Sequence, residues 1–133
     1  MVIEQVTFDD DGVLVAHVRP GKRVGRRCGR CGRRGPWYDR GEGRRRWRSL
    51  DLGATRAWLE ADAPRVDCPQ HGPTVVAVPW ARHGAGHTRR FDDMVAWLAV
   101  HTSKTAVGQL MRIAWRTVGA IVARVSADAE GGR

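Results

Sequence analysis

The chain has 133 residues, a formal net charge of +9 and a pI of about 11.1. Such a basic balance favours a polyanionic partner, which is a nucleic acid or an anionic membrane surface. No apolar run reaches the roughly 18 residues that a membrane span needs, and the N-terminus has no apolar signal-peptide core. We therefore exclude a membrane-spanning protein and expect a cytoplasmic one.

A β-hairpin is predicted at the start of the chain. Val2–Phe8 and Gly12–Val18 have the composition of strands. The sequence Asp9-Asp10-Asp11-Gly12 between them is typical of a turn.

Residues 19–48 are the most basic part of the chain. They hold thirteen Lys and Arg residues against Asp39 and Glu42, an excess of eleven positive charges that is larger than the net charge of the whole chain. Trp37, Tyr38 and Trp47 lie among the arginines, an arrangement that suits stacking and backbone contact with nucleic acid. The alternatives are a solvated loop and a membrane-surface patch, but the arginines do not follow an amphipathic helix. We expect phosphate contacts from Arg33, Arg34, Arg44, Arg45, Arg46 and Arg48.

Two short motifs flank this stretch and have the spacing of metal ligands. Cys28 and Cys31 form a CxxC pair, and Cys68 and His71 form a CxxH pair. Three cysteines and one histidine complete a closed tetrahedral zinc site, which has no open position for water and is therefore structural. All three cysteines of the chain are used, and their odd number argues against a disulfide framework. The alternative donors, His83 and His87, are separated by two glycines that disfavour a rigid pair.

Further strands are expected at Trp47–Leu52, Thr55–Ala61 and Thr74–Trp80, and strands interleaved with the two ligand pairs indicate a zinc ribbon. Residues 83–87 are glycine-rich and are predicted to be a linker.

After residue 87 the apolar period changes to that of helices. Phe91, Met94, Val95 and Leu98 share one face of a first helix, with Asp92 and Asp93 in its first turn. Ser103 is the expected N-cap of a second helix, Lys104–Met111, and a third helix is expected at about Trp115–Ser126.

The second and third helices have the pattern of a helix-turn-helix. Val107 and Leu110 are expected to face inward, Gly108 to allow close helix approach, and Ile113 to fill the turn. Arg112 occupies the turn position where glycine is usual, so the turn is either looser or touches phosphate itself. The other side of helix three is basic, polar and slim, which suits the major groove. The residues expected to contact DNA are Arg112, Trp115, Arg116, Thr117, Ala120 and Arg124.

The order of these motifs resembles a known family. It runs from a hairpin and the CxxC pair through Arg45-Arg46-Trp47-Arg48-Ser49-Leu50-Asp51 and the CxxH pair to Arg89-Arg90-Phe91 and Ala114-Trp115-Arg116-Thr117-Val118. Over about residues 2–125 this resembles the N-terminal part of transposases of the ISL-three (ISL3) group of insertion sequences. The resemblance implies that Cys28, Cys31, Cys68 and His71 bind zinc and that helix three reads the terminal inverted repeats.

The family also has a large catalytic domain whose three carboxylates bind two divalent ions. Because this chain ends before such a domain, we expect its DNA-binding portion alone, with no catalytic residues and no enzymatic activity.

The expected fold is therefore α+β, with a zinc-ribbon β-domain at 1–82 and a helix-turn-helix domain at 88–128. The expected ligands are structural Zn²⁺ and double-stranded DNA, without a small-molecule substrate, and a homodimer is left open. Localisation to a bacterial cytoplasm, with the nucleoid as the DNA-bound site, follows. The alternatives are a stand-alone transcriptional regulator or transposition inhibitor, and a zinc-ribbon module that binds RNA or a protein partner.

Overall fold

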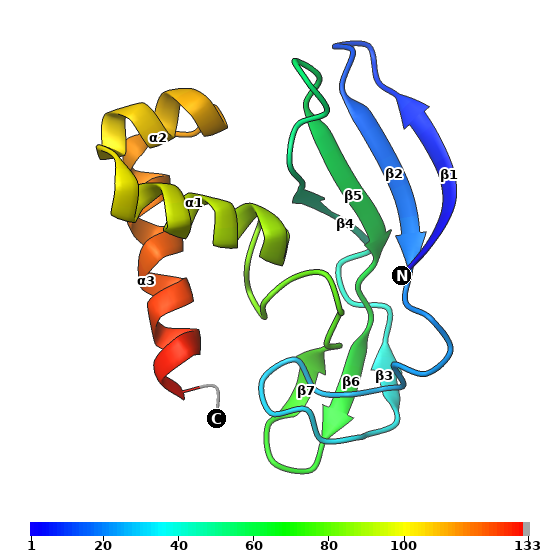
Figure 1. Ribbon diagram of the computed structural model, residues 1–133. Helices are drawn as coiled ribbons and strands as arrows, with labels where there is room; N and C mark the ends of the chain where they lie inside the picture. The colour runs from blue at the N-terminus through cyan, green and yellow to red at the C-terminus, as the bar shows by residue number, and fades with distance from the viewer. Residues whose placement is uncertain (132–133) are drawn as a thin grey trace. The chain divides into compact units, whose positions relative to one another are not determined.

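The computed structural model describes residues 1–131, and the chain divides into two compact units (Figure 1). The first unit, Met1–Thr88, contains all the strands, and the second begins at Arg89 and is helical. The α+β class predicted from the sequence is confirmed. Among the described residues, no helix is both long and apolar enough to cross a membrane.

The predicted hairpin is present and forms one side of a four-stranded sheet. Its strands are β1 (Val2–Phe8) and β2 (Leu14–Arg19), which pair antiparallel. The sheet order is β1-β2-β5-β4, with β5 (Ala57–Asp62) parallel to β2 and β4 (Arg44–Arg48) antiparallel to β5. Asp9 closes the hairpin, since its Oδ1 accepts hydrogen bonds from the N–H groups of Asp11 and Val13, both at 3.0 Å.

One face of this sheet carries the core. Trp47 is 1% exposed and meets Trp80 edge-on, with ring centroids 5.5 Å apart. The same cluster contains Ala16, Val18, Leu59, Ala61, Ala63 and Ala81. Strand β4 begins within the basic stretch and not at Trp47 as predicted. The burial of Trp47 fixes the register in which β4 pairs with β5.

Strand β1 extends the core face without being covered. The register shifts between Ile3 and Gln5, and this bulge keeps Ile3 on the same face as Val6 and Phe8. These three side chains are 57%, 50% and 66% exposed.

A second, three-stranded sheet surrounds the ligand pairs. Its order is β3-β6-β7, with β3 at Trp37–Asp39, β6 at Arg65–Cys68 and β7 at Gly72–Val75. The strand expected at Thr74–Trp80 is displaced: β7 ends at Val75, and the chain then turns so that Trp80 enters the first core. A second small core contains Cys28, Val66, Cys68 and Val76.

The segment expected to be a linker is an ordered part of the first unit. Ala85 is fully buried, and the backbone around it pairs with β4. The Arg48 N–H donates to the Gly86 carbonyl at 2.9 Å, and the Thr88 N–H donates to the Arg48 carbonyl at 2.8 Å. The glycines of this segment therefore permit a tight turn against β4 and do not make the segment a flexible linker.

The second unit consists of α1 (Arg89–His101), α2 (Lys104–Met111) and α3 (Trp115–Gly131). Its core contains Phe91, Val95, Val107, Val118 and Ile121, each at most 1% exposed. Leu110 differs from the prediction: it is 65% exposed, because the eight-residue α2 turns Val107 and Gly108 toward its neighbours.

Candidate metal centre and nucleic-acid interface

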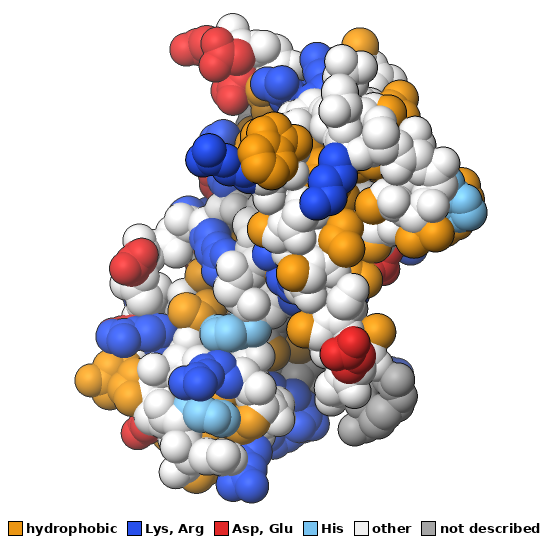
Figure 2. All heavy atoms as spheres, turned by 90° about the vertical axis from the view of Figure 1, so that its left-hand side faces the viewer, with side chains coloured by type: hydrophobic (Ala, Val, Ile, Leu, Met, Phe, Trp, Pro, Cys, Tyr) orange, Lys and Arg blue, Asp and Glu red, His pale blue; other side chains and the backbone are white. Residues whose placement is uncertain are grey.

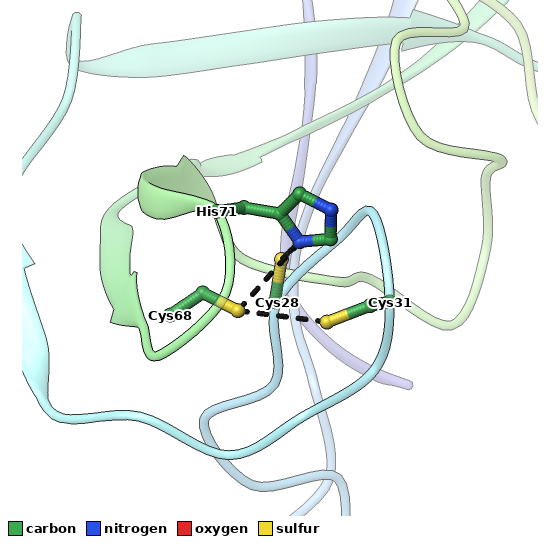
Figure 3. A group of neighbouring side chains, drawn as sticks. All are labelled: Cys28, Cys31, Cys68 and His71. Atoms are coloured by element: carbon green, nitrogen blue, oxygen red, sulfur yellow. Dashed lines mark hydrogen bonds between the residues drawn. The ribbon is translucent and has the colours of Figure 1, made fainter.

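The four predicted ligands meet at one point, where their donor atoms all lie within 4.8 Å of one another (Figure 3). The Cys31 and Cys68 sulfurs are 3.5 Å apart, and the Nδ1 atom of His71 lies 3.8 Å from the Cys28 sulfur and 3.7 Å from that of Cys68. Zn–S bonds of about 2.3 Å place tetrahedral ligands about 3.8 Å apart. The donor set and its spacing therefore fit zinc, with Nδ1 as the histidine donor.

The two ligand pairs adopt equivalent turns although only one contains two cysteines. The N–H of Arg30 donates to the Cys28 sulfur, and the N–H of Gln70 donates to the Cys68 sulfur, both at 3.4 Å. A glycine with positive φ follows each pair, Gly32 at 78° and Gly72 at 69°. Such backbone angles favour glycine, so each pair is held by local geometry as well as by the metal.

These N–H groups also tune the thiols. Burial raises the pKa of Cys28 and Cys68, but the backbone donors outweigh it and the pKa of both thiols lies below the ordinary value. At Cys31 the N–H of Arg33 lowers the pKa, yet desolvation and the two neighbouring thiols raise it above the ordinary value. Nearby arginine charge and bound Zn²⁺ both favour the thiolate forms.

The alternative donors are not in this cluster. Among the described residues, the group that can hold a metal contains neither His83 nor His87. Burial, with Arg30 and Arg45 nearby, lowers the pKa of His83, so this imidazole is neutral at pH 7.

Several arginines expected to contact phosphate are engaged within the fold. Glu60 lies between Arg46, whose Nε donates to it at 2.9 Å, and Arg44, whose Nε donates at 3.2 Å. Arg44 also reaches Asp62 at 3.3 Å. The hydrogen bond from Arg46 lowers the pKa of Glu60 despite partial burial, with a further contribution from Arg44. These arginines hold β4 against β5.

Arg48 and Arg45 also have partners within the fold. Arg48, which was predicted to contact phosphate, is 6% exposed and pairs with Asp51 at 3.4 Å within the fold. Arg45 lies over the Trp47 ring at 4.9 Å and donates to the Ala85 carbonyl at 2.6 Å. It fastens residues 83–87 to β4.

Most of the exposed basic side chains of residues 19–48 belong to the loop between β2 and β3. We name this set the ribbon loop: Lys22, Arg23, Arg26, Arg30, Arg33 and Arg34. No ion pair joins any of them to another residue of the described part of the chain. On the face of the molecule in Figure 2, Lys and Arg side chains are spread widely with few Asp and Glu side chains between them.

The helix-turn-helix has the predicted cap, and its turn is tight. The Ser103 hydroxyl accepts a hydrogen bond from the Ala106 N–H at 3.1 Å and caps α2. Arg112 ends α2 in the left-handed conformation, with φ 59° and ψ 48°. The Ile113 N–H then donates to the Gly108 carbonyl at 3.0 Å. A β-carbon at Gly108 would lie 2.9 Å from the Ile113 oxygen, so this position requires glycine.

The predicted reading residues at the start of α3 are presented outward. Arg116 and Ala120 are exposed, Thr117 is half-buried, and Trp115 is 62% exposed. The Arg116 guanidinium lies 5.7 Å from the centre of the Trp115 ring. Arg112 is exposed at the turn beside them.

Arg124 has a different position from the one predicted. It donates through Nε and Nη2 to the two carboxylate oxygens of Asp92, each at 3.1 Å, and Asp92 is 0% exposed. This bidentate pair joins α3 to α1. Sequence reasoning treated Asp92 as a helix-dipole residue only; its place three residues before Val95 of the apolar face was the available signal for burial.

Comparison with known proteins follows the same division of the chain. Residues 25–71 match the zinc-finger of transposase IS204/IS1001/IS1096/IS1165, and residues 76–126 match the helix-turn-helix domain of transposase family ISL3. No solved structure gives a significant match.

Two curated relatives from Mycobacterium tuberculosis strains, each named transposase for insertion sequence element IS1557, are 67% identical to the chain over 134 residues. The alignments cover 97% of this chain and 30% of each relative. The two matches contain the four ligands of the metal centre and most of the helical unit, so the chain has the zinc-finger and the helix-turn-helix domain of ISL3-type transposases.

Proposed function

We propose that this chain binds double-stranded DNA sequence-specifically, at the inverted-repeat ends of an insertion sequence, as the DNA-binding part of a transposase. The observation that carries the proposal is the outward presentation of Arg116, Thr117 and Ala120 by a capped, tightly turned helix-turn-helix of family ISL3. Insertion into the major groove needs a slim, polar helix face of this kind.

Each reading residue has a role that fits its chemistry. Arg116 is the candidate for a bidentate hydrogen bond to a guanine edge, Thr117 for contact with a thymine methyl, and Ala120 for close approach. Arg124 is left out of this set, because Asp92 uses its donors.

We also propose a phosphate contact on α2, beside the reading face. Lys104, Thr105 and Gln109 border a shallow hollow with Gly108, Ile113 and Trp115. The Lys104 amine at the start of α2 supplies the positive charge, and the Trp115 ring forms one side of the hollow. Phosphate contacts of this kind fix register and carry no sequence information.

The ribbon loop supplies the second part of the proposed interface. Arg33 and Arg34 were predicted to contact phosphate and are exposed, whereas Arg44, Arg45, Arg46 and Arg48 have partners within the fold. We assign phosphate contact to the ribbon loop, and to β4 we assign the support of the sheet. Cys28 and Cys31 lie in the middle of this loop, so bound zinc would hold it in place.

A binding selection on the purified chain against random duplex DNA tests the proposal, with the zinc content measured on the same sample. One zinc per chain together with an enriched motif is the expected result. Arg116→Ala should lose discrimination at one base position, and Arg56→Ala, an exposed arginine outside the proposed interface, is the matched control. Zinc without any enriched motif would overturn sequence-specific binding and favour an RNA or protein partner.

A further inference from the structure

An open cavity of about 390 Å³ lies in the first unit, at the ends of its two parallel strands. Strand β2 ends at Arg19 and β5 ends at Asp62, and both run toward the three-stranded sheet (Figure 1). Pro20 and Pro64 follow these two ends, and proline cannot donate to a β-ladder. The chain therefore leaves both strands here, and a cavity remains between the two sheets.

The floor of the cavity is apolar and belongs to the two cores of the unit. Val18 and Ala61, each 1% exposed, come from the core face of β2 and β5. Val76 comes from the small core around the ligand pairs, and Val78 packs against both cores. The volume lies in the range of small-ligand pockets, about 300–1,000 Å³. The cavity therefore has the size and the floor of a pocket for a flat, largely apolar group.

Trp37 contributes an aromatic wall to this cavity. It lies on β3 and is 51% exposed. The next residue, Tyr38, is similarly exposed at 53%, but the Arg65 guanidinium lies over its ring at 5.1 Å. Among the described residues, no ring or cation stacks on Trp37 in this way. An uncovered aromatic ring beside a basic loop is a platform on which a nucleobase can stack.

The rim of the cavity carries both cations and carboxylates. Arg26 belongs to the ribbon loop, and within the described part of the chain it has no ion pair. Arg19 lies 3.6 Å from Glu4, and Arg44 lies 3.3 Å from Asp62. The side chains of Glu4 and Asp62 are 50% and 81% exposed, so their carboxylates can accept further hydrogen bonds. The rim therefore suits a ligand that combines an anionic group with hydrogen-bond donors.

The carboxylate of Glu4 is at this rim because β1 is irregular. Ile3 pairs with Val18 and Gln5 pairs with His17, so Glu4 is the extra residue of the bulge. A bulge re-aims the side chain of its extra residue, and bulges are frequent beside binding sites.

We propose that this cavity binds one unpaired nucleotide of a DNA strand, with the base stacked on Trp37 and the phosphate at Arg26. A paired base cannot enter, because it must first leave the stack of the duplex. The amino group of cytosine, adenine or guanine can donate to Glu4 or Asp62, whereas thymine has no amino group. The ribbon loop around the cavity favours a nucleic acid over an apolar side chain of a protein partner. This role is separate from the reading of duplex DNA by α3 and does not rest on it.

Fluorescence anisotropy of the zinc-loaded full chain tests the proposal with two forms of one short duplex. One form carries a single-stranded tail of deoxycytidines, and the other carries a tail of abasic nucleotides of the same length. Both contain the same duplex and the same number of phosphates, so contacts of α3 and of the ribbon loop with them are equal. The expected result is about tenfold tighter binding of the deoxycytidine tail, the contribution of stacking one base.

Substitution of Trp37 locates this preference in the cavity. Trp37→Ala should abolish it and leave the affinity for the abasic tail unchanged, and Trp37→Phe should retain part of it because the smaller ring still stacks. Trp97→Ala is the matched control and should keep the preference, because Trp97 is 59% exposed on α1 and does not line the cavity. Circular dichroism and zinc content establish that each variant is folded.

A tail of deoxythymidines tests the orientation of the base. It should bind about threefold more weakly than the deoxycytidine tail, since it lacks the amino donor. Asp62→Ala should reduce this difference. Equal binding of the two tails by the wild-type chain would overturn the assignment of the base edge to the carboxylates.

Equal binding of the deoxycytidine and abasic tails overturns the proposal, as does a preference that Trp37→Ala leaves intact. Without DNA, a monomer–dimer equilibrium that Trp37→Ala weakens would show that the cavity takes a side chain of a second copy, which also contradicts the proposal. The binding selection uses paired duplexes, so its outcome and the outcome of this comparison are independent of each other.

Discussion

At the scale of single residues, the zinc ligands make the most direct prediction. Cys28→Ser should release the metal and unfold the ribbon, because structural zinc contributes on the order of 10 kcal/mol to the folding of such small domains. Zinc content by atomic absorption and thermal melting by circular dichroism measure both effects. A Cys28→Ser chain that retains one zinc and its melting temperature would contradict the ligand set.

The two nearby histidines provide a control for this prediction. His71→Ala should lose zinc, since its Nδ1 lies 3.7 Å from the Cys68 sulfur. His83→Ala should keep it, since His83 is outside the cluster of donor atoms. The opposite pattern would move the fourth ligand to the segment before the helices.

Two arginines of α3 are predicted to behave differently, although both have the same charge. Arg116→Ala should weaken binding to the selected site by about 1–3 kcal/mol and leave the free energy of unfolding unchanged. Arg124→Ala should lower the free energy of unfolding by about 3 kcal/mol, because it leaves the buried Asp92 without its bidentate partner. Fluorescence anisotropy with the selected duplex and urea unfolding separate the two effects. Equal loss of DNA affinity in both variants without any loss of stability would return Arg124 to the reading face.

At the scale of elements, the helix-turn-helix depends on one close approach. Gly108→Ala would place a β-carbon 2.9 Å from the Ile113 oxygen, which is backbone and cannot move freely. We expect a loss of about 1–3 kcal/mol in the free energy of unfolding. Gly119 in α3 is the matched control, because a β-carbon there meets only the end of the Lys104 side chain at 3.9 Å. Gly119→Ala should stabilise the chain by about 0.5–1 kcal/mol, and denaturant titration of both variants checks the contrast.

The turn itself shows how an element can follow a pattern while one residue departs from it. Arg112 adopts the left-handed backbone conformation that usually favours glycine. The sequence left open a looser turn, but the structure has a tight one, closed by the hydrogen bond from Ile113 to Gly108. A left-handed arginine costs about 1–2 kcal/mol, and the packing of α2 and α3 offsets this cost.

At the scale of the whole molecule, the charge distribution predicts how binding depends on salt. Arg33→Ala should weaken binding to every duplex alike and reduce the slope of log K against log salt by about 0.9, the value for one phosphate contact. Arg44→Ala should change the slope little, because Arg44 is paired with Glu60 and Asp62. Affinities measured at several salt concentrations test the contrast. A larger change for Arg44→Ala than for Arg33→Ala would place β4, instead of the ribbon loop, on the DNA.

The excess of positive charge in residues 19–48 therefore has two uses. In the ribbon loop it remains available to solvent, whereas in β4 it neutralises Glu60, Asp62 and Asp51. The local sequence supplies a partner only for Arg48, because Asp51 follows it by three residues, whereas the partners of Arg44 and Arg46 lie on β5.

The amino-acid sequence by itself determined the metal ligands, the hairpin, the cap at Ser103 and the three helices. Each depends on residues close together in the chain: two-residue ligand spacing, turn residues between strands, and apolar positions at helical intervals.

Only the tertiary structure decided which charged residues are available to a ligand. The Arg124–Asp92 pair, the arginines of β4 and the docking of residues 83–87 all depend on partners brought together by packing. The exposure of Leu110 and of Met94, Trp97 and Val100 on α1 has the same cause. Periodicity shows that a helix has an apolar side, but the number and placement of its neighbours decide which apolar residues are covered.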